Sequence, residues 1–258
     1  MQLDEKLVVV TGSGRGIGRA MAVAFAQKRA NLALLDLNSD DLAQTRSLCE
    51  ALGVRAQSYV CNVTHEDDVS VTLDAVVRDF GRLDVMINNA GITKDALLVK
   101  VQDGKVVGKM SLAQWQAVID VNLTGVFLGG REAAARMVTL THSGVASGGV
   151  IISTSSISRV GNMGQSNYSA AKGGVASLTV VWAKELARYG IRTGAIAPGF
   201  TRTDILDAMK PEMIERAVAA VPLKRMAEPA EMAHAAIFIA ENDYFSGRVI
   251  EVDGGQRI

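Results

Sequence analysis

Short apolar runs rich in β-branched residues alternate along the whole chain with longer stretches of helical period. Brief apolar runs bounded by turn residues indicate strands, and apolar residues three and four apart indicate helices that cover a core. The predicted strands are residues 7–11, 32–37, 55–60, 85–88, 150–154, 193–197 and 248–252. The predicted helices are residues 17–27, 40–52, 66–80, 112–140, 168–189 and 229–239.

This alternation predicts βαβ units and therefore a parallel sheet. The fold class is α/β, with seven parallel strands in a doubly wound sheet that carries helices on both faces. No Pro- or Ser-rich linker divides the chain, so we expect a single domain over residues 1–258.

Residues 96–110 depart from this alternation of strand and helix patterns. The pair Asp103-Gly104 stands between the apolar-containing runs at 99–101 and 106–107, and Asp-Gly in such a setting favours a tight hairpin turn. We expect a small hairpin-like excursion at the surface.

Composition excludes several classes of protein. The 258 residues include 27 basic and 27 acidic side chains without a run of like charge, so no nucleic-acid partner is expected. The two cysteines, Cys49 and Cys61, have neither metal-ligand nor disulfide spacing, which indicates no metal site and a reducing, cytoplasmic location.

Residues 1–6 are charged, and no apolar run approaches the roughly 20 residues that span a bilayer. No membrane contact is therefore expected.

A glycine-rich segment joins the first predicted strand to the first predicted helix. It reads Thr11-Gly12-Ser13-Gly14-Arg15-Gly16-Ile17-Gly18. Exposed backbone N–H groups and the helix dipole at such a junction bind a dinucleotide pyrophosphate, and glycines let the backbone approach the phosphates. The alternative is a merely flexible turn, but the strand-loop-helix setting favours nucleotide binding.

Asp36 ends the second predicted strand, about twenty residues beyond this loop. A carboxylate there can accept hydrogen bonds from the adenosine ribose hydroxyls and repels a 2′-phosphate, which favours NAD(H). Arg15 lies within the loop and argues the other way, because a guanidinium pairs well with a phosphate. NAD(H) is the predicted cofactor and NADP(H) the alternative; a third reading makes Asp36 a simple turn or cap residue.

Two further segments follow predicted strands at the same edge of the sheet. Asn88-Asn89-Ala90-Gly91 comes after the fourth strand, where amides and small residues suit a cofactor crevice. Cys61-Asn62-Val63 follows the third strand and carries a weaker signal. A plain turn that closes a βα unit is the alternative for both segments.

Tyr168 and Lys172 lie four residues apart in a predicted helix, and Ser155 lies thirteen residues upstream of the tyrosine. Positions i and i+4 share a helix face, so the Lys172 ammonium is expected to lower the pKa of the Tyr168 phenol from about 10. A phenol tuned in this way can shuttle a proton near neutral pH.

Together these segments resemble the short-chain dehydrogenase/reductase family of single-domain Rossmann enzymes. The resemblance covers residues 6–255, and within the family the chain is most similar to bacterial 3-oxoacyl-acyl-carrier-protein reductases. Its fingerprints are Thr11-Gly12-x-x-x-Gly16-x-Gly18, Asn88-Asn89-Ala90-Gly91, Asn122, Ser155, Tyr168-x-x-x-Lys172 and Pro198-Gly199.

The resemblance implies a role for each of these residues. Tyr168 is expected to be the acid in carbonyl reduction and the base in alcohol oxidation, while Lys172 binds the nicotinamide ribose. Ser155 is expected to hydrogen-bond the substrate oxygen, and Asn122 to hold a water in a proton relay. The expected cofactor-binding residues are Gly12, Ser13, Gly14, Arg15, Gly16, Ile17, Gly18, Asp36, Leu37, Asn62, Val63, Asn89, Ala90, Gly91, Tyr168, Lys172, Pro198, Gly199, Thr201 and Thr203.

Several positions depart from the carrier-protein reductases. Those enzymes carry basic residues before the serine strand and at the end of the tyrosine helix, but residues 141–149 hold no Lys or Arg and Tyr189 stands where an arginine is expected, with Arg188 adjacent. Docking of an acidic carrier is therefore in question. Asp36 also departs from their NADP preference, and Asn62 stands where the family commonly has an aspartate near the adenine.

The resulting prediction is an NAD(H)-dependent oxidoreductase that interconverts a secondary alcohol and a ketone. Its substrate is expected to be a small carbonyl or alcohol compound, free or CoA-linked, such as an acyl thioester. The first alternative is an NADPH-dependent 3-oxoacyl-acyl-carrier-protein reductase, and the second is a dinucleotide-binding protein without turnover. The resemblance also implies a substrate lid near residues 203–226 and a homotetramer formed through the helices at 112–140 and 168–189.

Overall fold

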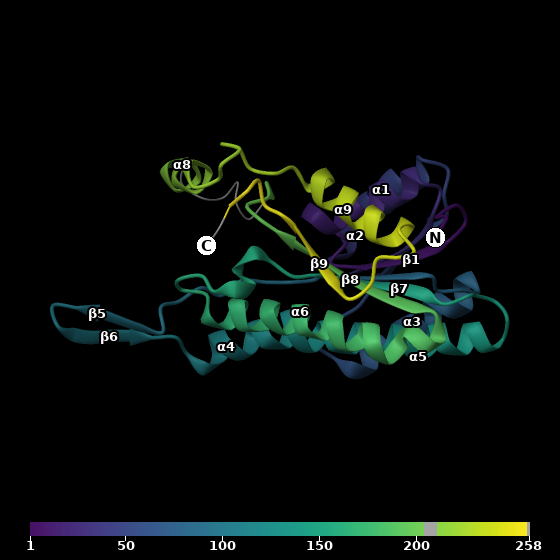
Figure 1. Ribbon diagram of the computed structural model, residues 1–258, viewed down its shortest axis with the longest axis horizontal. Coiled ribbons are helices and arrows are strands. Elements are labelled where there is room, and N and C mark those ends of the chain that lie inside the picture. The colour runs from purple at the N-terminus through teal and green to yellow at the C-terminus, as the bar shows by residue number, and fades with distance from the viewer. Residues whose placement is uncertain (204–210, 257–258) are drawn as a thin grey trace.

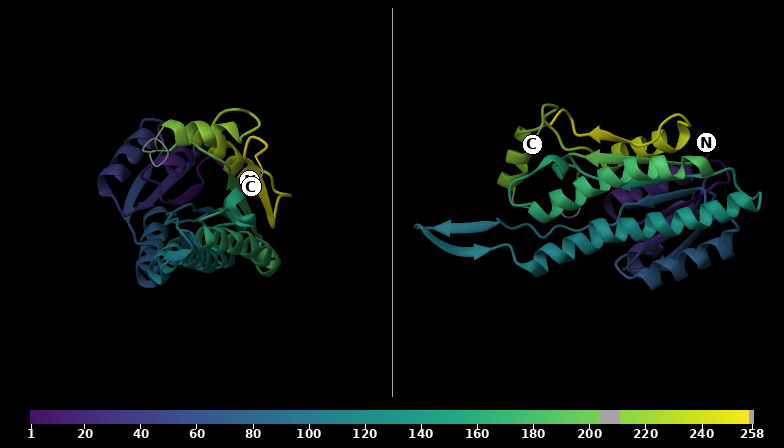
Figure 2. Two further views of the ribbon diagram at one scale, coloured as in Figure 1. Left: turned by 90° about the vertical axis from the view of Figure 1, so that its left-hand side faces the viewer. Right: turned by 60° about the horizontal axis from the view of Figure 1, so that its bottom comes forward.

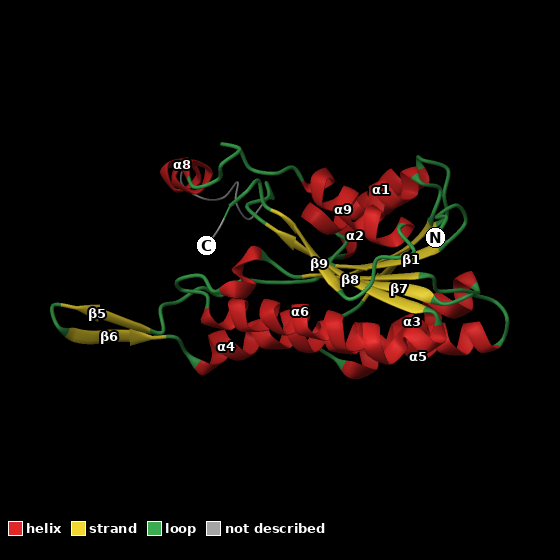
Figure 3. Ribbon diagram, in the orientation of Figure 1, coloured by secondary structure: helices red, strands yellow, loops and turns green. Residues whose placement is uncertain are grey.

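The computed structural model describes residues 1–203 and 211–256, which form a twisted parallel sheet between two layers of helices (Figures 1 and 3). The sheet confirms the predicted seven parallel strands, in the order β3-β2-β1-β4-β7-β8-β9. Their bounds are β1 (Leu7–Thr11), β2 (Asn31–Asp36), β3 (Ala56–Val60), β4 (Val85–Asn88), β7 (Gly149–Thr154), β8 (Ile191–Pro198) and β9 (Arg248–Val252).

Helices cover both faces of this sheet (Figure 1). One layer consists of α1 (Gly16–Gln27), α2 (Ser39–Glu50) and α9 (Pro229–Glu241). The other consists of α3 (Glu66–Phe80), α4 (Leu112–Ile119), α5 (Gly125–His142) and α6 (Ser166–Leu186). The described residues also include α8 (Pro211–Ala219), the π-helical turn η1 (Asp120–Thr124), and the 3₁₀ turns η2 (Ile157–Val160) and η3 (Ala187–Tyr189).

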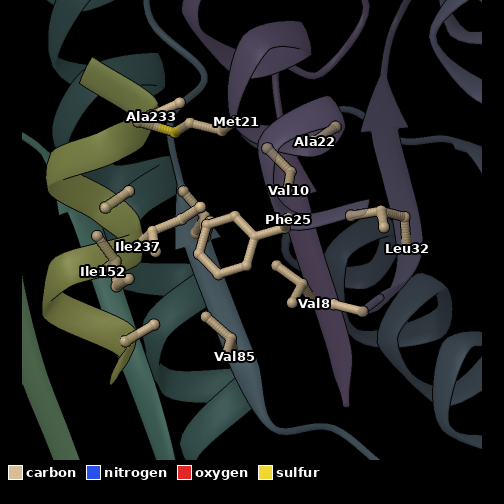
Figure 4. Close-up of a cluster of buried hydrophobic side chains, with 14 of the residues drawn as sticks. Val8, Val10, Met21, Ala22, Phe25, Leu32, Val85, Ile152, Ala233 and Ile237 are labelled. Carbon is tan, nitrogen blue, oxygen red and sulfur yellow. The ribbon is translucent and has the colours of Figure 1, made fainter. Parts of the chain in front are cut away.

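The inner strands contribute alternate side chains to two separate cores, because successive residues of a strand point to opposite faces of the sheet. Val8 and Val10 pack with α1, α2 and α9, whereas Leu7 and Val9 pack with α3 and α5. Phe25 of α1 is fully buried at the centre of the first core (Figure 4). Burying a side chain of that size stabilises the fold by about 1.5–3 kcal/mol.

The predicted helix at 112–140 is interrupted in the structure. Residues 120–124 form one π-helical turn between α4 and α5, although the apolar periodicity runs through the segment without a break. Within this turn, the Asn122 side chain forms two hydrogen bonds with the main chain of Ile92. Its Oδ1 accepts from the Ile92 amide, and its Nδ2 donates to the Ile92 carbonyl. A distant backbone segment therefore fixes the amide in a wider helical turn.

Residues 99–109 form an antiparallel hairpin of β5 (Val99–Gln102) and β6 (Lys105–Lys109) that projects from the body (Figure 2). Asp103 and Gly104 both have positive φ, at 50° and 71°, as the tightest hairpin turn requires. We call residues 96–110, which carry this hairpin, the arm. Its base is attached to the body, because the Ala96 amide donates to the Gly164 carbonyl at 2.9 Å. The arm thus begins beside the start of α6.

The order of the strands reverses at β1 and β4, with β2 and β3 on one side and β7 to β9 on the other. Ligands of doubly wound sheets bind at the carboxyl ends of the strands beside such a switch point. Across residues 1–203 and 211–256, no helix has the length and apolar character that crossing a membrane requires. No group of His, Cys, Asp and Glu side chains in the same ranges is placed to hold a metal ion.

Candidate active site

A groove of about 540 Å³ opens at the carboxyl ends of β1, β2 and β4. It runs from the glycine-rich loop and Asp36 at one end to Tyr168 and Lys172 at the other. We call these the nucleotide end and the proton-transfer end. The groove brings together Gly12, Arg15, Gly16, Ile17, Asp36, Leu37, Asn62, Val63, Asn89, Ala90, Gly91, Tyr168, Lys172 and Thr203 among the predicted site residues.

The remaining predicted residues do not line this groove. Ser13 and Gly14 of the loop and Gly18 of α1 are buried, and so are Asn122 and Ser155 near the proton-transfer end. Pro198 is the last residue of β8. Gly199 and Thr201 follow it, and the Thr201 hydroxyl donates to the Gly199 carbonyl at 3.1 Å. Of the predicted lid at 203–226, residues 204–210 lie outside the described residues.

The glycine-rich loop is shaped as a cradle for a phosphate group. Gly12 and Gly16 have φ values of 63° and 55°, which side chains rarely adopt. A Cβ added to Gly12 would lie 2.8 Å from the Ala90 Cα, and one on Gly18 would collide with the Gly12 carbonyl. Only glycines therefore allow this close approach of loop, helix and Ala90, and the exposed amides at the start of α1 suit a pyrophosphate.

Two residues that the sequence did not single out hold this loop. Thr45 of α2 donates its hydroxyl to the Ser13 carbonyl at 2.9 Å. Arg19 of α1 donates to the Gly14 carbonyl and, at 3.0 Å, to the Thr45 hydroxyl. The available signal was Thr45 itself, a polar residue between Leu42 and Cys49 on the buried face of a helix.

Asp36 is held by backbone amides at the nucleotide end. Its Oδ2 accepts from the Gly14 amide at 2.9 Å and its Oδ1 from the Leu37 amide at 2.7 Å. The Asn38 amide also donates to Oδ1, at 3.3 Å, so of the about four lone-pair sites of a carboxylate about one remains for a ribose hydroxyl. Asp41, another residue not predicted from the sequence, adds a second carboxylate to the groove, while Arg15 is exposed.

The two adjacent asparagines after β4 have different environments. Asn89 donates from Nδ2 to the Thr11 and Gly12 carbonyls, each at 3.2 Å, and accepts from the Thr154 hydroxyl. It therefore ties together the ends of β1, β4 and β7. Asn88 is 2% exposed, and neither polar atom of its side chain has a hydrogen-bond partner among the described residues.

Asn62 closes the turn after β3 by accepting from the amide and hydroxyl of Thr64 at 3.1 and 2.8 Å. Its side chain and that of Val63 border the nucleotide end of the groove. The amide oxygen of Asn62 is therefore engaged by its own turn, and its amide nitrogen lies 3.4 Å from the His65 Nε2.

Lys172 is buried at the proton-transfer end of the groove. Its Nζ donates to the Thr154 carbonyl at 2.7 Å and lies 5.5 Å from the centre of the Tyr168 ring. Burial lowers the pKa of Lys172 from 10.5 to about 8, because desolvation disfavours the ammonium.

The pKa of Tyr168 is raised above its ordinary value, and the prediction that Lys172 lowers it is wrong. Burial is the largest cause, a hydrogen bond with the Ser156 hydroxyl opposes it, and the charge of Asp95 adds to it. Desolvation disfavours the phenolate. The Lys172 ammonium is directed at a carbonyl instead of the phenol, and burial disfavours its charge as well.

Ser155 and Asn122 support the proton-transfer end from behind. The Ser155 hydroxyl donates to the main-chain carbonyl of Lys172 at 2.8 Å. A Cβ added to Gly91 would lie 2.6 Å from the Asn122 Oδ1 and 3.6 Å from the Lys172 Nζ. Gly91 thus separates the asparagine from the lysine, and its lack of a side chain lets them approach.

A doubly wound sheet whose glycine-rich loop shares one groove with a Tyr–Lys pair defines a dinucleotide-dependent oxidoreductase. Residues 12–257 match the sequence family described as enoyl-(acyl carrier protein) reductase. The chain belongs to the short-chain dehydrogenase/reductase family, and it is an enzyme that uses a nicotinamide dinucleotide.

Relatives cover the chain over nearly its full length. The chain is 38% identical to the 3-oxoacyl-acyl-carrier-protein reductase FabG of Thermotoga maritima, over 99% of both chains. It is 37% identical to the reductase of the same name from Staphylococcus aureus, over 97% of both.

Solved structures of dehydrogenases have the same fold. A 7α-hydroxysteroid dehydrogenase complexed with NADH and 7-oxo glycochenodeoxycholic acid has a TM-score of 0.89 at 27% identity, over 99% of this chain and 96% of that one. A putative gluconate dehydrogenase from Agrobacterium tumefaciens has a TM-score of 0.87 at 34% identity, over 98% of this chain and 96% of the other.

Proposed function

We propose that the protein is an NAD(H)-dependent oxidoreductase that interconverts a secondary alcohol and a ketone on an acyl thioester substrate. The observation that carries this proposal is the placement of Tyr168 and Lys172 in the same groove as the glycine-rich loop and Asp36. Proton transfer and dinucleotide binding then take place along one continuous surface.

The dinucleotide, when bound, supplies or accepts a hydride at the substrate carbon. In reduction, Tyr168 gives its phenolic proton to the substrate oxygen and afterwards takes a proton from solvent. Lys172 stabilises the phenolate that remains and binds the ribose beside it. Two further residues complete the proposed catalytic group. Ser155 donates its hydroxyl to the Lys172 carbonyl, and Asn122 lies across Gly91 from the Lys172 Nζ.

The carboxylates at the nucleotide end support NAD(H) over NADP(H). Asp36 is fixed by three amides at the groove, and Asp41 lines the groove near it. A 2′-phosphate at this position would lie against both negative charges. Among the described residues that line the groove, Arg15 is the cation that favours NADP(H), because its guanidinium could pair with that phosphate.

An acyl thioester is supported by the names of the relatives and by apolar side chains around the start of α6. Val160 is 70% exposed and Met163 88% exposed on the segment that leads to Tyr168, and Leu98 at the base of the arm is 69% exposed. Exposed apolar side chains beside a site can cover an acyl chain. Residues 141–149 lack the Lys and Arg side chains that would bind an acidic carrier protein. This favours a CoA thioester over one attached to a carrier protein.

A second candidate is an NADPH-dependent 3-oxoacyl-acyl-carrier-protein reductase, which the 38% identity to the Thermotoga maritima enzyme favours. The deciding experiment measures kcat/KM for 3-oxoacyl-CoA, 3-oxoacyl carrier protein, simple ketones and secondary alcohols with both cofactors. Our proposal expects NADH to be better than NADPH by an order of magnitude or more, and the CoA thioester to be turned over without a carrier. The reverse cofactor preference would favour the second candidate, and cofactor binding without any turnover would favour a non-catalytic protein.

We further propose that the enzyme is a homotetramer of the cytoplasm. Apolar side chains exposed on the two long helices support self-association, with Phe127 of α5 at 41% and Val180 and Val181 of α6 at 37% and 42%. Cys49 and Cys61 are buried and unpaired, in keeping with a reducing compartment. Light scattering after size-exclusion chromatography tests the assembly, and a monomer would contradict it.

A further inference from the structure

The arm at residues 96–110 is a basic element. It carries three lysines, Lys100, Lys105 and Lys109, and one acidic residue, Asp103, whereas the whole chain has 27 basic and 27 acidic side chains. All four residues are exposed, and none of them forms an ion pair with a side chain of residues 1–203 or 211–256. The arm therefore presents an excess of positive charge to solvent as it projects from the body (Figure 2).

The register of the hairpin places two of the three lysines on one face. Successive residues of a strand alternate between faces, and residues directly opposite each other in an antiparallel pair share a face. Lys100 is opposite Gly108, and Gln102 is opposite Lys105. The two lysines are therefore diagonal neighbours, about 7 Å apart. Gly108 leaves this face open, since a Cβ added there would lie 3.8 Å from the Lys100 Cβ.

The third lysine lies on the opposite face of the arm. Lys109 is opposite Val99, and Val101 is opposite Val106. These four side chains alternate with those of the first face and are mainly apolar. The arm thus has a basic face, with two lysines and no acidic side chain, and an apolar face with a single lysine at its end.

A short and fixed segment connects the arm to the proton-transfer end of the groove. Thr93 lines the groove, and two residues later the Asp95 carboxylate accepts from the Gln165 side chain at 3.0 Å. Gln165 comes just before the helix that carries Tyr168. Lys100 follows Thr93 by seven residues, so at about 3.3 Å per residue it lies at most roughly 23 Å from the groove wall.

Building on the proposed function, which includes CoA thioesters, we propose that Lys100 and Lys105 bind the phosphate groups of coenzyme A. The extended pantetheine chain of CoA separates the thioester from a diphosphate and a 3′-phosphate, so these phosphates lie outside the groove when the acyl group is beside Tyr168. An ammonium group is a compact charge that pairs with phosphate oxygens. Two of them on one open face, without a neighbouring carboxylate on that face, match this polyanion in charge and position.

The test compares two thioesters of the same 3-oxoacyl group, one of CoA and one of N-acetylcysteamine, which has no phosphate. Two exposed ion pairs account for roughly a three- to tenfold effect. In the double variant Lys100→Gln/Lys105→Gln, the KM for the CoA ester should rise by about that factor with kcat unchanged. Neither quantity should change for the N-acetylcysteamine ester, because it does not reach the arm.

Lys109→Gln is the matched control, because it removes the same charge from the other face of the same hairpin. It should raise the KM for the CoA ester by less than about twofold. A second readout needs no turnover: calorimetric titration of free CoA into the NADH-saturated protein, in which NADH keeps the adenine of CoA out of the nucleotide end. The double variant should weaken the Kd for CoA by the same factor as the KM.

An unchanged Kd for CoA in the double variant, an equal rise in Lys109→Gln, or an equal rise for the N-acetylcysteamine ester would overturn the proposal. So would an effect confined to a carrier-bound thioester, which would make the arm a docking surface for a carrier protein. A change in oligomeric state by light scattering would overturn it in favour of an interface between copies of this chain. A protein that turns over none of these thioesters would refute the proposed function, whereas the CoA titration would still decide whether the arm binds the phosphates.

Discussion

The two ends of the groove are built in opposite ways. At the nucleotide end, the polar groups that define the site are satisfied by neighbouring groups of the protein: three backbone amides donate to Asp36, and the Thr45 hydroxyl donates to the Ser13 carbonyl. At the proton-transfer end, Lys172 is buried and Tyr168 is half-buried at the wall of the groove, and desolvation displaces both pKa values toward the neutral forms.

This difference separates binding from chemistry in physical terms. A preformed cradle lowers the ordering cost of binding a dinucleotide. Buried titratable groups lower the stability of the protein but place proton-transfer groups in a desolvated site. Changes at one end should therefore affect affinity and cofactor choice, whereas changes at the other should affect turnover and pH dependence.

The largest expected effect follows from removing the phenol. Tyr168→Phe should lower kcat by about 10²–10⁴, the usual contribution of a general acid or base, and leave the Kd for NADH within about twofold. Steady-state assays and fluorescence titration measure the two quantities. Tyr244→Phe is the control, because Tyr244 is fully exposed. A parallel loss of NADH binding in Tyr168→Phe would contradict the separation.

Replacing Lys172 should stabilise the protein at neutral pH. A pKa of about 8 against 10.5 corresponds to a penalty of about 3 kcal/mol. The folded protein binds fewer protons than the unfolded chain between pH 8 and 10.5, so its free energy of unfolding rises with pH across that window. Below pH 8 the full penalty applies, and Lys172→Met removes it.

Lys172→Met also loses the hydrogen bond to the Thr154 carbonyl, which costs about 1 kcal/mol of the gain. Urea unfolding at pH 7 should therefore give this variant a free energy of unfolding about 2 kcal/mol above that of the wild type. The advantage should disappear as the pH rises toward 10.5. Lys184→Met, an exposed change on the same helix, should differ little from wild type at either pH. A destabilised Lys172→Met protein at pH 7 would show that burial of the ammonium is fully compensated.

At the nucleotide end, Asp36→Ala should change cofactor choice. Loss of the carboxylate removes hydrogen bonds to the ribose and the repulsion of a 2′-phosphate. The ratio of kcat/KM for NADH to that for NADPH should fall by about tenfold to a hundredfold, or about 1.4–2.8 kcal/mol. Asp40→Ala is the control, since Asp40 is exposed at the start of α2 and does not line the groove. An unchanged ratio would mean that Asp41 and Arg15, and not Asp36, determine the choice between NADH and NADPH.

The smallest effect is expected from the support beneath the loop. Thr45→Val keeps the shape of the side chain but removes the bond to the Ser13 carbonyl. We expect NADH affinity to fall by a few-fold, about 1 kcal/mol, with kcat unchanged at saturating cofactor. Isothermal titration calorimetry measures the affinity, and a loss of kcat would mean that the loop also acts on the chemistry.

The sequence predicted the sheet and both helical layers because apolar periodicity records which face of each element is buried. It missed the π-helical turn at 120–124, where the periodicity continues and a tertiary bond from Asn122 to Ile92 widens the helix. It also missed Arg19 and Thr45, whose partners are backbone carbonyls in another element. For Tyr168, the i,i+4 spacing predicted proximity to Lys172 but contained no measure of burial, which determines the direction of the pKa shift.

The central claim is that a hydride and a proton meet on one substrate in this groove. The most direct measurement supplies NADH deuterated at the nicotinamide C4 with a 3-oxoacyl-CoA and locates the label by mass spectrometry and NMR. The account predicts that deuterium appears on the new carbinol carbon in one configuration, and that the rate of transfer falls by at least about a hundredfold in Tyr168→Phe. Label lost to solvent, spread over both configurations, or transferred equally fast by Tyr168→Phe would contradict it.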